Sequence, residues 1–440
     1  MKNILISLCL VSSLYAGISI EKAWGEVELK NSGVKADIND VKRAKLKQES
    51  AKSMYLPSIS LSGSYTHLSE PIKIEDELTL PISNVALPIE IDLSKQDTFL
   101  ANLNLLWPLY TGGKIDAAQD IYAAEVSEAK AKKEMKKDTE FLKLVKYYYG
   151  VVVAKSLYET RFEAQKALSL HYENAKRLKE QGQIASVELL NAQVKYDAAK
   201  IETTKAKHKL DIASSALNLL IKSSLTPISK LFVNSNLRDE SYYKNETKEN
   251  YQGLKILDAK QRQSDSLISI KKAAWHPKVI GYANYNIYKD DSILMQTLPR
   301  WVAGVRVSID ILKRKDRSQE IEIAKLLNSK VKHLKDEAIE NLSLLVEKTY
   351  KEMLSSYEEF NSLSSSLALA KENYRLRNIS FNEGLSTSVE LVDAEMFLMG
   401  ARTKRLNAAY SFVQKLSQLS VLSGDRDMFF EIEKMSEGIE

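Results

Sequence analysis

Two carboxylates, Glu390 and Asp393, lie three residues apart in a segment with helical character. Residues at this spacing share one face of a helix. Carboxylates gathered at a narrow opening attract cations and repel anions. A segment 202 residues earlier holds Glu188 and Asn191 at the corresponding positions. An alternative interpretation is that such acids only favour the dipole of a helix's first turn.

These two segments are copies of one pattern, Gly-x-x-x-Ser-Val-Glu-Leu. Gly182 and Gly384 each interrupt a long helical pattern, and glycine readily ends a helix in a left-handed conformation. Ser186 and Ser388 are placed to cap the helix that follows. We therefore expect two helix-turn-helix tips in an internally duplicated chain.

No catalytic or metal-binding constellation is predicted. The five histidines stand singly, without a spacing such as His-Glu-x-x-His, and His171 is expected to pack between helices. Gly112-Gly113 lacks the lysine and serine of a phosphate-binding loop. The 63 basic and 58 acidic residues nearly balance, which argues against a dedicated nucleic-acid binder. We expect no enzyme activity, no cofactor and no metal ion.

Two long stretches without proline predict the helical part of the fold. The eight prolines leave 109–226 and 300–440 free, and interior proline strongly disfavours a helix. Apolar residues recur there at alternating spacings of three and four, which is typical of coiled-coil seams. We expect long helices over 114–181 and 184–222 in the first half, and over 313–383 and 386–423 in the second.

Four segments alternate with the period of two that is typical of strands, at about 57–68, 99–109, 278–288 and 301–311. About ten residues suffice for a tilted strand to cross a bilayer, and aromatic residues near strand ends, such as Trp107 and Trp301, are typical of membrane barrels. A four-stranded sheet packed on soluble helices is the alternative. Because four strands cannot close a barrel in lipid, several chains must pool them, and a trimer would have twelve.

The remaining segments complete the expected organisation. Residues 1–16 combine Lys2, an apolar run and a small residue, Ala16, which predicts a secretory signal peptide. Cys9 lies inside that run, too early for lipid attachment. We expect a first structural repeat over 17–222 and a second over 249–424, each with a helix before its strands. The rest are an external loop at 69–98, an equatorial connector at 223–248 and an equatorial C-terminal tail at 425–440.

The order of these motifs resembles the TolC outer-membrane efflux protein family. The resemblance rests on Leu56-Pro57 before a serine-alternating strand, Trp107-Pro108-Leu109-Tyr110-Thr111-Gly112-Gly113 before a long helix, and the paired tips. It implies a mainly helical chain that adds four strands to the twelve-stranded outer-membrane barrel of a homotrimer. It further implies a coiled-coil helical tunnel that extends into the periplasm of a Gram-negative-type envelope.

That resemblance implies the exit duct of a tripartite efflux or type I secretion system. Its partners would be a periplasmic adaptor protein, an inner-membrane pump or ABC transporter, and outer membrane lipid. The alternatives are a periplasmic coiled-coil scaffold or adaptor and a secreted fibrous adhesin. A scaffold would not need four strands of bilayer length, and an adhesin would not need duplicated tips.

The resemblance also implies a periplasmic gate at the tips. The family's constricting aspartates correspond to Glu390 and Asp393, and Phe381 occupies the position of a gate tyrosine. Ser386 stands where a closed gate would have an arginine paired with an acid at the Glu188 position, so that salt bridge would be missing. The other candidates are Glu188 and Asn191 at the gate, and Gly182, Gly384, Ser186 and Ser388 as tip residues that contact the adaptor.

Overall fold

The computed structural model describes residues 17–79, 86–311, 316–383 and 385–439. The predicted signal peptide, residues 1–16, lies outside the described residues. The chain divides into two compact units, unit 1 with Met1–Val41, Ala129–Ile256 and Lys335–Glu440, and unit 2 with Lys42–Glu128 and Leu257–Leu334. Each unit therefore combines segments from both halves of the sequence.

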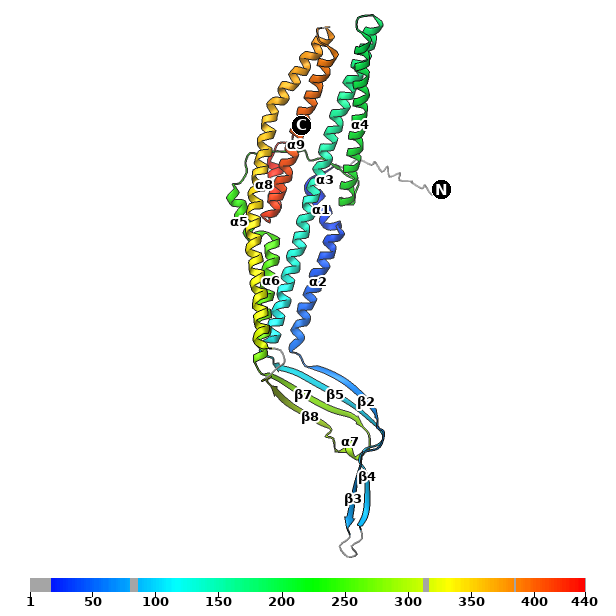
Figure 1. Ribbon diagram of the computed structural model, residues 1–440, viewed down its shortest axis with the longest axis vertical. Coiled ribbons are helices and arrows are strands. Elements are labelled where there is room, and N and C mark those ends of the chain that lie inside the picture. The colour runs from blue at the N-terminus through cyan, green and yellow to red at the C-terminus, as the bar shows by residue number, and fades with distance from the viewer. Residues whose placement is uncertain (1–16, 80–85, 312–315, 384, 440) are drawn as a thin grey trace, which may run out of the picture. The chain divides into compact units, whose positions relative to one another are not determined.

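Unit 2 contains an antiparallel sheet with the strand order β2 (Ser58–His67), β5 (Asp97–Tyr110), β7 (Lys278–Lys289) and β8 (Trp301–Ser308) (Figure 1). The first half of the chain meets the second where β5 pairs with β7, in a register that sets Asn104 opposite Asn284. β8 ends before the predicted position 311. The carbonyl of Asp310 accepts a hydrogen bond from the Arg317 guanidinium there, which replaces a strand partner. β2 and β8 are the edge strands.

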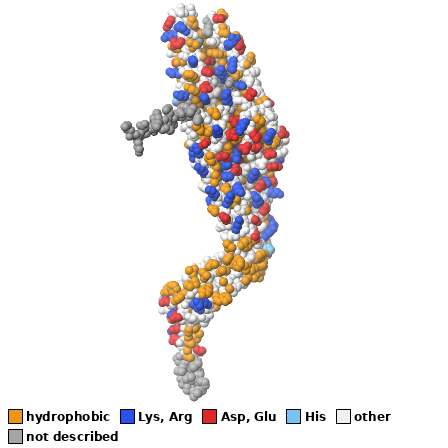
Figure 2. All heavy atoms as spheres, turned by 180° about the vertical axis from the view of Figure 1, so that it is seen from behind, with side chains coloured by type: hydrophobic (Ala, Val, Ile, Leu, Met, Phe, Trp, Pro, Cys, Tyr) orange, Lys and Arg blue, Asp and Glu red, His pale blue; other side chains and the backbone are white. Residues whose placement is uncertain are grey.

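The two faces of this sheet differ in chemistry. Leu61, Trp301 and Val305 belong to the apolar face and are 70%, 66% and 62% exposed. Figure 2 shows hydrophobic side chains gathered over the strands. On the polar face, Nδ2 of Asn284 donates to Oδ1 of Asn104 (2.7 Å), and Nδ2 of Asn104 donates to Oγ of Ser62 (2.9 Å).

A hairpin of β3 (Lys73–Thr79) and β4 (Ala86–Asp92) lies where the sequence predicts an external loop over 69–98. The acidic residues and Pro88 disfavour a strand in isolation. Antiparallel pairing, which sets Ile74 opposite Ile91, supplies the missing stabilisation. A short helix, α7 (Ile293–Thr297), similarly lies between β7 and β8.

Two antiparallel helical hairpins have their turns in unit 1 (Figure 1). α3 (Lys114–Glu180) leads into α4 (Ser186–Ile221), and α8 (Arg317–Asn382) leads into α9 (Ser388–Leu422). Helix α8 begins at Arg317, later than the predicted 313, and residues 312–315 lie outside the described residues.

The remaining helices repeat in pairs of equal length. α1 (Ile20–Lys30) and α5 (Glu240–Asn250) have 11 residues each, and α2 (Ser32–Lys52) and α6 (Gln252–Lys272) have 21 each. Both pairs are offset by 220 positions (240 − 20 and 252 − 32). The predicted fold class is confirmed: the chain is mainly helical, duplicated and carries a four-stranded sheet. None of its helices, over the residues described, has the length and apolarity to cross a membrane.

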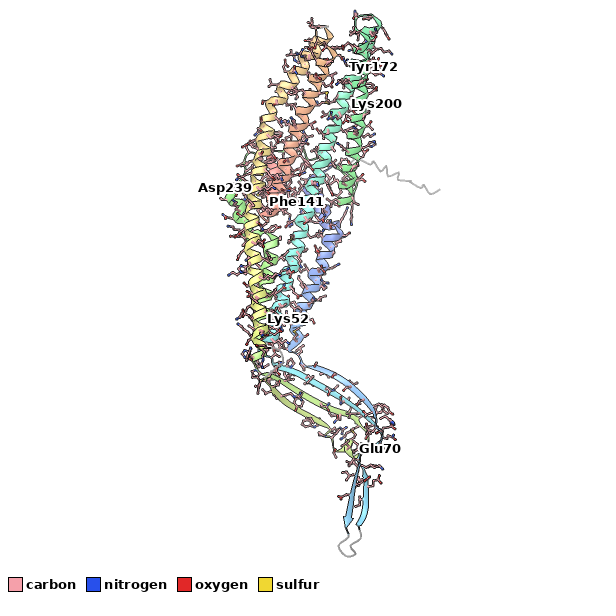
Figure 3. The ribbon with its side chains drawn as sticks, in the orientation of Figure 1. Lys52, Glu70, Phe141, Tyr172, Lys200 and Asp239 are labelled. Carbon is pink, nitrogen blue, oxygen red and sulfur yellow. The ribbon has the colours of Figure 1, made fainter. Side chains whose placement is uncertain are left out.

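The core of unit 1 is aromatic. Phe141 of α3, labelled in Figure 3, packs edge to face on Trp24, Phe429 and Phe430, with ring centroids 5.3, 5.5 and 5.6 Å away. Phe429 and Phe430 belong to α10 (Asp427–Met435), a helix inside the segment predicted as a tail. The predicted connector similarly contains most of α5. Both helices are short, so packing, more than local propensity, stabilises them.

Buried polar contacts fix the connector and the tail to α3. The hydroxyl of Tyr148 donates to the carbonyl of Ile18 (2.6 Å) and accepts from the backbone N–H groups of Ile228 (3.1 Å) and Ser229 (2.9 Å). The N–H of Ile228 also bonds to the carbonyl of Ile18 (3.1 Å), so the hydroxyl is the added partner of these two groups and the partner of the Ser229 N–H.

The guanidinium of Arg426 donates to the carboxylates of Asp138 (2.7 Å) and Glu134 (3.1 Å), and its Cζ lies 5.7 Å from the Trp24 ring centre. Asp138 is 5% exposed, and its Oδ2 has no hydrogen-bond partner in the described part of the chain. Burial raises the pKa of Asp138 to about 6, although the charge of Arg426 acts in the opposite direction.

Candidate functional site

The first tip joins α3 to α4 through a glycine turn. Gly182 adopts a left-handed backbone with φ of +71°, and the N–H of Gln183 bonds to the carbonyl of Leu178 (2.9 Å). This arrangement closes a helix end. The N-cap of α4 is Ala185, without a side-chain cap. The expected cap by Ser186 is therefore wrong, because Ser186 is already the first helical residue.

The second tip has a complete capping box in place of the expected Ser388 cap. Gly384 lies outside the described residues. The hydroxyl of Thr387 accepts from the N–H of Glu390 (3.3 Å), and the carboxylate of Glu390 accepts from the N–H of Thr387 (3.2 Å). Each residue thus satisfies a backbone donor that the helix start leaves free. The cap is Thr387, one residue earlier than expected, because α9 begins at Ser388.

Glu390 also accepts two side-chain hydrogen bonds. Oγ of Ser386 lies 2.6 Å from its Oε2, and the Arg377 guanidinium lies 3.2 Å from the same oxygen. The bond from Ser386, the backbone bond from Thr387 and the charge of Arg377 together lower the pKa of Glu390. Glu390 therefore has a salt bridge with Arg377 of α8. This bridge is not the one expected to be missing, which would join position 386 to the acid at Glu188.

Within the described residues, the hydrogen bonds of Glu390 come from Ser386, Thr387 and Arg377 and from no other gate candidate. Asp393 and Asn191 are exposed, and Glu188 is half-buried in the first turn of α4. Because Asp393 and Asn191 face solvent, a second copy or a partner would have to complete any ring that they form.

Phe381 and Ser388 meet at His171, a residue that the sequence predicts to pack between helices. The rings of His171 and Phe381 lie 4.6 Å apart at 65°. Nε2 of His171 is hydrogen-bonded to Oγ of Ser388, whereas its Nδ1 is buried without a partner in the described residues. Burial lowers the pKa of His171. The first repeat is thereby connected to the second, through α3 and α9.

Glu395 is a buried acid that the sequence reasoning missed. It is 7% exposed, and burial raises the pKa of its carboxyl to about 7. The sequence could have indicated its burial, because Glu395 lies between Leu391 and Leu398 on the buried face of α9. No group of three or more His, Cys, Asp or Glu side chains in the described ranges is placed to hold a metal ion.

A family model described as outer membrane efflux protein matches residues 26–221 and 245–425. The CmeC outer membrane channel of Campylobacter jejuni is 14% identical, with a TM-score of 0.73 over 94% of this chain and 89% of that chain. The outer membrane protein VceC of Vibrio cholerae is 13% identical, with a TM-score of 0.74 over 92% and 96%. The open state of the MtrE outer membrane channel of Neisseria gonorrhoeae is 14% identical, with a TM-score of 0.74 over 92% and 89%. No curated protein sequence matches the chain.

Proposed function

We propose a duct mechanism from the premise that this chain belongs to the outer membrane efflux protein family. The protein is an outer-membrane efflux channel that extends into the periplasm. In our proposal, three copies form the exit duct of a tripartite efflux or type I secretion system. The duct carries substrates from the periplasm or an inner-membrane pump to the exterior. A periplasmic adaptor protein contacts the tips at Gly182, Gly384, Ser186 and Ser388.

The proposal that three copies form the duct rests on the two edge strands of the sheet. Among the described residues, β2 and β8 end the four-stranded order, so each leaves backbone groups without a strand partner there. In lipid such groups must be paired, and a closed barrel is the arrangement of strands that pairs them all. Joining β8 of one copy to β2 of the next closes a barrel, and three copies supply twelve strands. The apolar face would then meet lipid, and the ladder of Ser62, Asn104 and Asn284 would line the interior.

An exposed seam on α4 supports the same association. Val187, Val194 and Ile201 recur every seven residues and are 57%, 65% and 56% exposed. A repeat of seven on one helix face is the pattern that packs against another helix in a coiled coil. A second copy is therefore expected to cover this seam in the tunnel.

The gate proposal places Glu390 and Asp393 in rings at the periplasmic end of the tunnel. The contacts of Glu390 with Ser386, Thr387 and Arg377 hold its carboxylate in one orientation. Asp393, one turn further along α9, is exposed and available to permeating ions. Rings of carboxylates favour cations and retain multivalent ones.

Single-channel recording in planar bilayers tests the gate. Glu390→Gln combined with Asp393→Asn removes both charges and keeps a residue that can still complete the capping box. We expect higher conductance and loss of block by multivalent cations, because the retaining charge is gone. Asp197→Asn is the matched control, since Asp197 is an exposed acid of α4 away from the tip turn.

Two results would contradict different parts of the proposal. Unchanged block in the double variant would remove the gate assignment and leave the duct intact. A purified chain that stays monomeric and water-soluble without detergent would contradict the duct itself and favour the coiled-coil scaffold.

A further inference from the structure

Few charged side chains lie on the strands of the four-stranded sheet. The lysine, arginine and acidic residues of β2, β5, β7 and β8 are Asp97, Lys278, Lys289 and Arg306. Side chains two positions apart on a strand share a face, so Asp97 belongs to the apolar face with Leu103. Lys289 ends β7, and its Nζ donates to two backbone carbonyls at the end of α7. The remaining two charges are those of Lys278 and Arg306.

Lys278 and Arg306 are neighbours on the polar face, and we call them the basic pair. Lys278 shares that face with Asn284, six positions further along β7. Val302 lies opposite Asn284, and Arg306 is four positions after Val302 on β8. Ile280, two positions after Lys278, lies opposite Arg306 (Figure 1). The basic pair is therefore a diagonal pair across two strands, with Cβ atoms about 7–8 Å apart.

The basic pair has no counter-charge of its own. Arg306 is exposed, and Lys278 is half-buried. Within the parts of the chain that the structure describes, neither side chain forms a salt bridge. Asp310, the acid nearest to Arg306 in the sequence, lies beyond the end of β8. Two positive charges thus lie together on a polar surface, where they attract anions.

An aromatic ring lies beside Arg306. The guanidinium Cζ is 5.3 Å from the centre of the Tyr282 ring, on the neighbouring strand. The ring lies across Gly304, because a Cβ at that position would be 2.8 Å from the hydroxyl oxygen and 3.0 Å from Cζ of Tyr282. A guanidinium can contact a ring through its face and still offer the N–H groups of its edge to two oxygens of one oxyanion.

We propose that the basic pair and Tyr282 bind organic anions that leave through the duct. Arg306 and Lys278 would hold a carboxylate, sulfonate or phosphate group, and Tyr282 would contact the apolar part of the solute. This inference rests on the proposed duct, in which three copies would repeat the pair around the barrel. Rings of arginine and lysine favour anions in pores.

The neighbouring copy would leave the basic pair open. In the proposed barrel, β2 of the next copy adjoins β8. That strand carries serine at alternate positions from Ser58 to Ser64 and has no acidic residue. Small neutral side chains would therefore flank Arg306, and its charge would stay available to a solute.

Single-channel recording under a KCl gradient tests this selectivity. The chain with Glu390→Gln and Asp393→Asn serves as the background, so that the tip charges do not set the permeability ratio. Adding Arg306→Gln and Lys278→Gln should lower the ratio of chloride to potassium permeability at least about threefold. Adding Arg306→Lys alone keeps the charge and should keep this ratio within about twofold. Lys22→Gln, which changes an exposed lysine of α1 in unit 1, is the matched control and should leave the ratio unchanged.

Binding of pyranine, a fluorescent aromatic trisulfonate, gives a second measurement that needs no channel activity. Fluorescence anisotropy on the purified full chain in detergent should show binding that weakens at least about fivefold in Arg306→Gln and weakens with added salt. Lys22→Gln should bind as the unchanged chain does.

The two measurements separate the anion site from the duct. Equal pyranine affinity in the unchanged chain and in Arg306→Gln would overturn the anion site, as would a permeability ratio that ignores the loss of the basic pair. A chain that binds pyranine through Arg306 but forms no channel would contradict the duct proposal alone.

Discussion

Replacing Arg426 with glutamine should destabilise unit 1 in a way that depends strongly on pH. Arg426 donates to Asp138 at 2.7 Å, and Asp138 is 5% exposed. Without the guanidinium, the ionised carboxylate would be buried and unpaired. Removal of one partner of a buried ion pair typically costs about 3–5 kcal/mol.

The sign of the pH dependence follows from the pKa of Asp138, which rises from 3.8 to about 6 on folding. A pKa unit corresponds to about 1.4 kcal/mol, so this rise amounts to about 3 kcal/mol. The stability that protonated Asp138 contributes is fully present below pH 3.8 and is lost as pH rises through about 6. Arg426→Gln raises the pKa of Asp138 further. The free energy of unfolding of this variant should therefore be about 3–5 kcal/mol lower than that of the unchanged chain at pH 8. At pH 4 the lost hydrogen bonds and the lost pair with Glu134 remain, together worth about 1–2 kcal/mol.

Thermal unfolding in detergent, followed by circular dichroism at pH 4 and pH 8, measures this difference. Adding Asp138→Asn to Arg426→Gln should restore most of the stability at pH 8, because no buried charge then remains unpaired. Arg402→Gln is the matched control, since the Arg402–Glu163 pair at 3.1 Å is largely exposed and such pairs contribute about 0–1 kcal/mol. Equal destabilisation at both pH values, or no rescue by Asp138→Asn, would refute the reasoning.

Four further substitutions test other contacts of unit 1. Tyr148→Phe leaves the N–H of Ser229 without its hydroxyl partner, whereas Ile228 and Ile18 keep their mutual backbone bond. It should lower the free energy of unfolding by about 1–3 kcal/mol, measured by denaturant titration; an unchanged midpoint would contradict this. Thr387→Val removes the cap of α9 and should cost about 1 kcal/mol, seen as faster hydrogen exchange in its first turn and nowhere else. Gly424→Ala should destabilise more than Gly182→Ala in thermal unfolding: both have φ of +71°, but a Cβ at 424 would lie 2.9 Å from the carbonyl oxygen of Asn250, whereas nothing lies within 4 Å at 182. Equal losses of thermal stability in the two variants would contradict this, because they would show that the left-handed backbone alone, and not the contact with Asn250, sets the cost.

Much of the fold could be predicted because its signals are local. The alternation in β7 and β8 and the three-four spacing in the long helices reflect which side of each element is apolar, and neighbouring residues determine that. Gly182 similarly ends α3 through its own backbone conformation. Local patterns therefore sufficed for the mainly helical, duplicated class.

Contacts between residues distant in the chain were beyond such patterns. The hydrogen bond between His171 and Ser388 joins positions 217 residues apart. The salt bridge of Glu390 comes from Arg377, on the other side of the tip turn, and the sequence analysis did not predict it. The hairpin of β3 and β4 contains residues that disfavour strands, so its stability depends on pairing that no single segment reveals.

The ladder on the polar face of the sheet has a consequence for anything that passes over it. The amides of Asn104 and Asn284 and the hydroxyl of Ser62 are bonded to one another across three strands. Water wets such a surface, yet several of its donors and acceptors are already engaged with one another. A solute that moves along this ladder would find few free groups with which to form hydrogen bonds. The ladder would therefore bind passing solutes weakly and would not select among them.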